Sequence, residues 1–135
     1  VNTITEFQRN AALDAAAHEM ASTLRTARTK SVAGSVNTGE TSATFTNDGL
    51  PYFGITTLAN GTYNLTRTFT PIGGSEKKEI LETHTMDSLF TVTPSSFVIT
   101  FARVSGAPST TMTITIARTT NSRIITVDAN GNINL

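Results

Sequence analysis

The chain contains no cysteine and no tryptophan, and only 15% of its residues are charged. The absence of cysteine excludes disulfides, thiolate metal sites and thiol nucleophiles, but it does not fix the compartment, because many exported proteins also lack this residue. Ten basic residues balance ten acidic ones. The net charge of the whole molecule therefore does not favour binding of nucleic acid, an anionic membrane or acidic ligands. Any such binding must come from a local patch of positive charge.

Long apolar runs are also missing. The sequence has no run of about 18 or more consecutive apolar residues, so no segment of it as given predicts a membrane span. The chain nevertheless begins at Val1, without an initiator Met and directly in helix-forming sequence. We therefore expect that further residues precede it and were removed by processing or truncation.

Glycine and proline are absent from the first 33 residues. Between Ile4 and Ala33 alanine is the commonest residue, and apolar side chains recur at spacings of three and four. This periodicity predicts one long helix with a single apolar face, made of Leu13, Ala17, Met20, Leu24 and Ala27. Thr3 or Thr5 is expected to cap its start, and Gly34 is placed where a left-handed residue would end it.

The predicted helix is long for a domain of this size. About 30 residues rise roughly 45 Å, whereas a domain of this mass is only about 25 Å thick. We therefore expect part of the helix to extend beyond the domain, where it needs a partner or a membrane. Small residues at 11, 12 and 15–17 would permit close approach by another helix, although helix propensity alone explains them equally well.

All nine glycines and all four prolines lie from Gly34 onward, where apolar and polar residues alternate. Threonine forms about a fifth of the chain and suits strands with one face in water. The alternation predicts strands at 42–46, 52–58, 62–69, 80–85, 89–92, 97–103, 112–118, 123–127 and 132–135. Asn60-Gly61 and Asn130-Gly131 are the best tight hairpins, and the mixed charges of 76–79 are expected to solvate a turn.

The sequence thus predicts an α+β protein in which one long N-terminal helix, residues 1–34, packs on an antiparallel, Thr-rich β domain, residues 35–135. Short connections favour a meander of antiparallel strands, and the length favours one domain built from both parts.

This layout resembles the type IV pilin-like proteins. The matching features are the helix end Leu24-Arg25-Thr26-Ala27-Arg28-Thr29-Lys30-Ser31-Val32-Ala33, the β domain after it, and the closing strand pair from Ile124 to Ile133 around Asn130-Gly131. The H-type pseudopilins of type II secretion and the related minor pilins are the most similar members. The resemblance implies a hydrophobic N-terminal half-helix, here absent, with a methylated N-terminus. That half would lie in the inner membrane before assembly and later in the core of an envelope-spanning or extracellular filament.

On this resemblance we expect a structural subunit that binds other pilin or pseudopilin subunits, not an enzyme. The helix residues expected to divide between a helical bundle and the protein's own sheet are Phe7, Leu13, Ala17, Met20, Leu24 and Ala27. Met20→Asp or Leu24→Asp should unfold the domain, whereas changes near Phe7 should mainly impair assembly.

Candidate catalytic and metal-binding residues are few. His18 and His84 are the only histidines, and no nucleophile motif surrounds any serine. His18 is expected on a solvated helix face. Glu82 and His84 share one face of a predicted strand and could offer two metal ligands, although an exposed strand edge is the favoured interpretation. We expect no cofactor.

Two alternatives stay open. One is a cell-surface β-sandwich that binds carbohydrate or protein, for which Tyr52, Phe53 and Tyr63 are the candidate aromatic platforms. The other is a minor pilin that binds DNA through a cluster of cations at the end of the helix, made of Arg25, Arg28 and Lys30. Three further arginines could join this cluster across the sheet, namely Arg103, Arg118 and Arg123. Positive charge at these positions also complements the helix dipole, which is the favoured explanation.

Overall fold

A computed structural model describes residues 2–58 and 61–135, and the burial of side chains from Thr5 onward. The predicted helix is present as α1 (Asn2–Ala33). Because it begins at Asn2, Thr3 and Thr5 lie inside the helix instead of capping it. Its end is as predicted: Gly34 has φ +63°, and the amides of Gly34 and Ser35 donate to the carbonyls of Ser31 and Lys30 at 3.2 and 3.0 Å. These two hydrogen bonds form a left-handed Schellman stop.

The β domain consists of two four-stranded antiparallel sheets. The first sheet has the order β3-β2-β1-β5 and the second the order β4-β6-β7-β8. Their strands are β1 (Tyr52–Thr57), β2 (Thr62–Phe69), β3 (Lys77–Thr85), β4 (Thr91–Thr93), β5 (Val98–Thr100), β6 (Met112–Arg118), β7 (Asn121–Val127) and β8 (Ile133–Asn134). The predicted α+β arrangement of a helix on antiparallel strands is confirmed. The expected meander is wrong, because the chain passes between the sheets after β3, after β4 and after β5.

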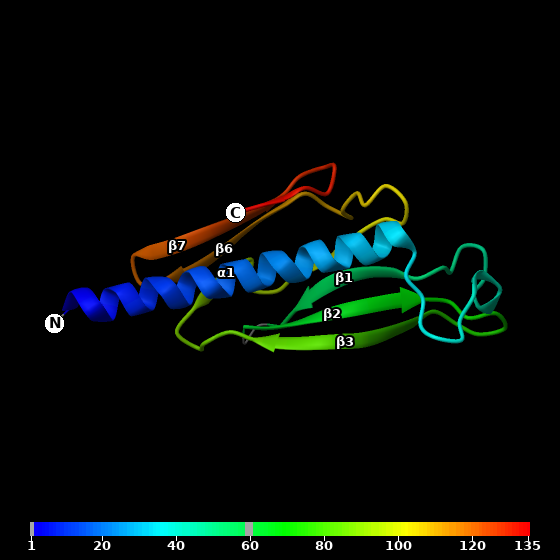
Figure 1. Cartoon of the computed structure of the whole chain (residues 1–135), viewed down its shortest axis with the longest axis horizontal. Helices are drawn as coiled ribbons and strands as arrows, with labels where there is room; N and C mark the ends of the chain where they lie inside the picture. Colours follow the sequence, from blue (N-terminus) through cyan, green and yellow to red (C-terminus); the bar gives the residue numbers. More distant parts are fainter. Residues whose placement is uncertain (1, 59–60) are drawn as a thin grey trace.

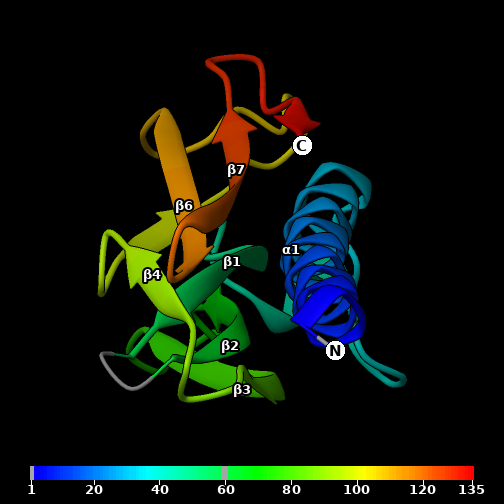
Figure 2. The ribbon, with the colours of Figure 1, turned by 90° about the vertical axis from the view of Figure 1, so that its left-hand side faces the viewer.

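Figures 1 and 2 show α1 running alongside both sheets; in Figure 2 both sheets lie to the left of α1, with β6–β7 above and β1–β3 below. The apolar face of α1 packs against both of them. This core includes the predicted helix residues Leu13, Ala17, Met20, Leu24 and Ala27, with Ile55, Leu65, Ile99, Ile114, Ile116 and Ile125 from the strands. Burying each Leu, Met or Ile side chain contributes about 1.5–3 kcal/mol, so α1 is an integral part of the domain.

The strand predictions fail at two places. Residues 42–46 form a 3₁₀ turn at Ser42–Thr44, and only Phe45 pairs, in an isolated bridge with Pro71. Residues 77–79 are the first part of β3 instead of a solvated turn, and Glu79 lies opposite Arg67 of β2. β5 is also shorter than predicted.

Of the two predicted hairpins, Asn130-Gly131 is confirmed as the turn between β7 and β8. Gly131 has φ +86°, and the Asp128 amide donates to the Asn132 carbonyl at 3.1 Å. The Asn60-Gly61 prediction falls partly outside the described residues.

Candidate assembly surface on the N-terminal helix

The predicted assembly residues of α1 divide sharply by burial. Leu13 is 1% exposed, and Ala17, Met20, Leu24 and Ala27 are 0% exposed, all against the protein's own sheets. Phe7, in contrast, is 73% exposed. Only Phe7 among the six residues can therefore contact another molecule while the domain stays folded.

The start of α1 extends past the strands at the left of Figure 1, and residues 2–12, of which no described side chain is buried, are called the projecting segment below. None of residues 5–12 is buried, although Asn10 is half-buried. Glu6, Arg9 and Asn10 line a small hollow of about 60 Å³ with the β6–β7 turn. The segment thus rests on that turn along one side, and Phe7 is exposed.

An ion pair joins α1 to the second sheet just beyond the projecting segment. The Arg123 Nε of β7 donates a short hydrogen bond to the Asp14 Oδ1 of α1. This hydrogen bond holds the pKa of the Asp14 carboxyl below its ordinary value. Asp14 therefore marks the side of the helix that faces β7.

A second polar contact joins α1 to the first sheet. The His84 Nδ1 of β3 donates to the Glu19 Oε1 at 2.6 Å, and the His84 ring stacks on Tyr63 with centroids 5.0 Å apart. Burial raises the pKa of the Tyr63 hydroxyl above its ordinary value. His84 lies on β3, which is an edge strand of the first sheet as the favoured interpretation expects, and it ties this strand to the helix.

The metal interpretation of Glu82 and His84 gains no third ligand. Among the residues that the structure describes, no three His, Cys, Asp or Glu side chains are grouped as a metal site would require. His18 is exposed, as expected, and its Nδ1 donates to the Asp14 backbone carbonyl at 2.8 Å.

An apolar groove lies beside the Glu19–His84 contact. It has a volume of about 250 Å³ between α1 and the connection from β3 to β4. Its apolar lining comes from the small helix residues Ala12, Ala15 and Ala16 on one side, and from Met86 and Phe90 on the other. Glu19 and Asp87 add negative charge to this groove, which is called the α1–β3 groove below.

The three cations at the end of α1 take separate positions. Arg25 donates to the Ile133 carbonyl at 3.0 Å, and Arg28 donates to the Asn130 carbonyl at 3.4 Å. Lys30 lies 5.7 Å from the centre of the Phe53 ring. The two arginines thus fix the loop after β7 to the helix, a contact that was predicted neither by the favoured helix-dipole explanation nor by the alternative of an anion contact.

The other arginines do not join this cluster. Arg123 is paired with Asp14, and Arg118 lies over the Phe90 ring at 6.0 Å, toward the other end of α1. Only Arg103 lies near the helix end, beside Gly34. The positive patch that these arginines could have formed across the sheet is therefore not assembled.

Of the three candidate aromatic platforms, Phe53 and Tyr63 are 2% and 1% exposed and belong to the core. Tyr52 is half-buried and lines an open hollow of about 350 Å³. Asn47, Asp48, Arg103 and Ser109 supply polar groups to the same hollow.

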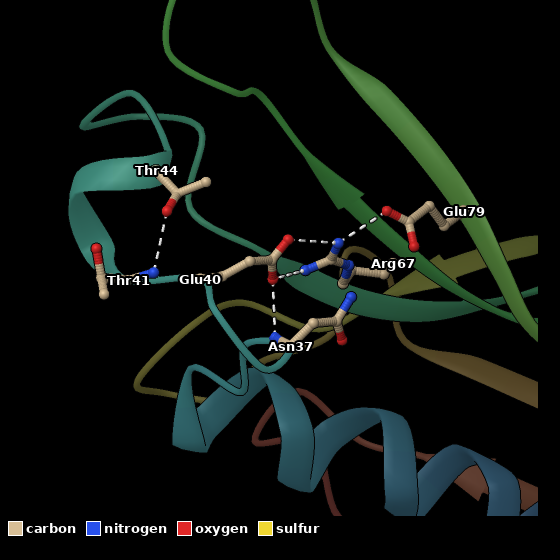
Figure 3. Close-up of polar contacts among 6 residues, drawn as sticks. All are labelled: Asn37, Glu40, Thr41, Thr44, Arg67 and Glu79. Carbon is tan, nitrogen blue, oxygen red and sulfur yellow. Dashed lines mark hydrogen bonds and ion pairs between the residues drawn. The ribbon is translucent and has the colours of Figure 1, made fainter.

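A buried arginine in β2 was not expected from the sequence. Arg67 is 1% exposed, and its guanidinium donates to Glu40 at 2.7 and 3.1 Å and to Glu79 at 2.7 Å (Figure 3). The Phe69 ring centre lies 4.2 Å from it. The Arg67 hydrogen bond holds the pKa of Glu40 below its ordinary value. This network fastens the loop between α1 and β1 to the first sheet.

Comparison with known proteins finds no matching family model, no matching curated protein and no matching solved structure. Within the described residues, no helix combines the length and the apolar content that crossing a bilayer requires.

Proposed function

We propose that this chain is a pilin-like structural subunit, a minor pilin or pseudopilin of a type IV pilus or a type II secretion pseudopilus. Its work is assembly. In this proposal it resides in the cell envelope or in an extracellular filament, and it is anchored in the inner membrane before assembly. The observation that supports the proposal is the division of α1 into a buried part and a projecting segment.

The division is informative because exposing an apolar side chain to water is unfavourable in free energy. Contact with another subunit would bury that side chain and remove this cost. From Leu13 onward one apolar face of the helix packs against both sheets, so the β domain holds this part of the helix in one orientation. Phe7 then presents an aromatic side chain in a fixed direction, and aromatic anchors supply much of the energy of protein interfaces. Subunits built this way can associate through the helix while their β domains face outward.

The test uses cells that produce the whole protein. Filaments are sheared from the cell surface, and the chain is sought in them by mass spectrometry. We expect wild-type protein in the filaments and loss of the Phe7→Asp variant from them, with no change in its thermal unfolding. A matched Thr29→Asp variant, at an exposed position on the buried part of the helix, should still be incorporated. Absence of wild-type protein from the filaments, or equal incorporation of Phe7→Asp, would contradict the proposal.

A second candidate function is carbohydrate binding, and the hollow at Tyr52 favours it. A half-buried aromatic ring with Asn47 and Asp48 beside it combines an apolar face with paired hydrogen-bonding groups, as a sugar requires, and its volume suits a small ligand. A glycan array with wild-type protein and Tyr52→Ala tests this function. Specific binding that disappears in Tyr52→Ala and survives Phe7→Asp would support it.

DNA binding by a minor pilin stays a prediction. A mobility shift that weakens with salt in the wild type and is reduced in Arg28→Ala would support it.

A further inference from the structure

The open hollow of about 350 Å³ beside Tyr52, called the Tyr52 hollow below, is lined by two segments that are far apart in the chain. Residues 47–52 lead into β1, and residues 100–109 connect β5 to β6. The Thr70 amide donates to the Gly49 carbonyl at 2.8 Å and holds the first segment against the end of β2. A Cβ at Gly49 would collide with Thr70, so only glycine permits this close approach.

The second segment is a tight loop whose ends are paired. The Ala102 amide donates to the Ala107 carbonyl at 2.8 Å, and the Ser105 amide donates to the Arg103 carbonyl at 2.8 Å. The latter bond closes a γ-turn around Val104, which has φ +69° and is 79% exposed. A γ-turn of this hand is strained, above all for a β-branched residue. Strain of this kind is typical of ligand sites, and here it fixes the backbone that carries Arg103.

The Tyr52 hollow carries two opposite charges that do not neutralise each other. Asp48 comes from the first segment and Arg103 from the second. In the part of the chain that the structure describes, neither side chain forms an ion pair. The Arg103 Nε is buried and has no hydrogen-bond partner there. A guanidinium in this state is unfavourable in free energy, so its neutralisation by a bound anion would be favourable.

The remaining lining suits a ligand with one apolar face and several hydroxyl groups. The half-buried Tyr52 ring, Leu50 and Pro108 supply apolar surface, and Asn47 and Ser109 supply hydrogen-bonding groups. Pockets for small ligands commonly combine such apolar walls with a few convergent polar groups.

We propose that the Tyr52 hollow binds a sugar that carries a carboxylate, such as a uronic acid. This inference rests on the carbohydrate binding named above as the second candidate function, and it specifies the class of sugar. The carboxylate accepts hydrogen bonds from Arg103, whose planar guanidinium matches such a group. Asp48 accepts hydrogen bonds from the sugar hydroxyls, and the Tyr52 ring packs on the apolar face of the sugar. A neutral sugar would leave Arg103 without its counter-charge.

The Tyr52 hollow is remote from the projecting segment. The Arg103 guanidinium lies beside Gly34, with its Nη2 3.3 Å from where a Cβ of Gly34 would stand. Gly34 follows Phe7 by 34 − 7 = 27 residues, which is about 40 Å along a helix. Ligand binding in the hollow therefore leaves Phe7 free for the assembly contact.

The test compares three sugars that differ at one group. Purified wild-type protein is titrated with glucuronate, glucuronamide and glucose, and binding is followed by the NMR shifts of backbone amides. Glucuronamide replaces the carboxylate by a neutral amide of similar shape, so the comparison reports the charge. We expect glucuronate to bind at least about tenfold more tightly than either neutral sugar, as a charge-assisted hydrogen bond predicts. The shifted amides should lie in residues 47–52 and 100–109.

Substitution of the arginine separates ligand binding from a structural role. Arg103→Gln should reduce the affinity for glucuronate to that for glucuronamide and leave the affinity for both neutral sugars unchanged. Arg118→Gln is the matched control, because Arg118 lies over the Phe90 ring of the α1–β3 groove and does not line the Tyr52 hollow. Tyr52→Ala should weaken the binding of all three sugars. If Arg103→Gln lowers the temperature of thermal unfolding but keeps the preference for glucuronate, Arg103 only supports the end of α1, and the proposal is wrong.

The other outcomes distinguish this inference from the functions proposed above. Equal affinity for the three sugars, or shifts that lie outside the two segments, would overturn the acidic-sugar site and leave carbohydrate binding standing. Tighter binding of L-alanine, which offers a carboxylate and an ammonium group but no sugar ring, would also overturn it. Failure of all three sugars to bind, together with a blank glycan array, would remove carbohydrate binding and this inference together. The assembly role of α1 is independent of each of these results.

Discussion

Phe7 and Leu13 lie less than two turns apart on α1, yet Phe7 is 73% exposed and Leu13 is 1% exposed. The boundary between the exposed and the buried part of the helix lies between these two residues. Every side chain described before it, from Thr5 to Ala12, is at least partly exposed, and a regular series of buried residues follows it. One part of the helix therefore stays open to contacts and the other part forms the core of the domain, and the change from exposed to buried side chains occurs within a few residues.

The first prediction concerns the covered part of the helix. Leu24→Asp places a carboxylate at a 0% exposed position among apolar strands, so the free energy of unfolding should fall by more than about 3 kcal/mol. Urea unfolding followed by circular dichroism measures the change. Ser22→Asp, at an exposed position on the same helix, should alter the free energy of unfolding by less than about 0.5 kcal/mol. A similar loss in both variants would mean that the substitution acts on helix propensity and not on the core.

The second prediction concerns the Arg67 network. Glu40→Gln removes the charge that accepts two hydrogen bonds from the buried guanidinium, and we expect a loss of about 1–3 kcal/mol in the free energy of unfolding. Amide hydrogen exchange in residues 35–50 should also become faster, because Glu40 anchors this loop. Glu76→Gln is the control at an exposed position. Unchanged exchange in the loop would show that other contacts hold it.

The third prediction is the acid dependence of stability. The folded pKa of Glu40 lies below its unfolded value because Arg67 donates to it, so its contribution is fully present above pH 4.5 and is lost as the pH falls through the lowered pKa. The free energy of unfolding of the wild type should thus drop between about pH 5 and pH 2, and Glu40→Gln should show a shallower drop. Asp14 and Asp128 titrate in the same sense, because Arg123 and the Asn132 amide lower their pKa values. Parallel curves for wild type and Glu40→Gln would contradict the assigned cause.

The helix and most strands could be predicted because their signals are local. The three-and-four spacing of Leu13, Ala17, Met20 and Leu24 and the absence of glycine before Gly34 determine α1, and the alternation at 112–118 matches β6 at both ends. Alternation reports which side chains are buried, however, and not which sheet a strand joins. The division into two sheets therefore had no signal in the sequence.

The misassigned segments have physical reasons. Residues 42–46 alternate as a strand would, but the Thr44 amide donates to the Thr41 carbonyl at 2.9 Å and closes a 3₁₀ turn. The Thr41 amide in turn donates to the Thr44 hydroxyl at 3.0 Å. Residues 77–79 carry mixed charges typical of a turn, yet Glu79 is required opposite Arg67. The acidic partners of Arg67 lie 27 and 12 residues away in the chain, so no local pattern marks this arginine as buried.

The division of α1 is tested most directly by thiol labelling at position 7. Phe7→Cys supplies the only thiol in the chain, and its rate of reaction with a maleimide is compared between the purified protein and filaments on intact cells. We expect fast labelling of the purified protein, because Phe7 is 73% exposed, and strong protection in the filaments. Val98→Cys, on the β domain, should label at similar rates in both. Equal labelling of Phe7→Cys in the two states, or slow labelling in the purified protein, would contradict the account.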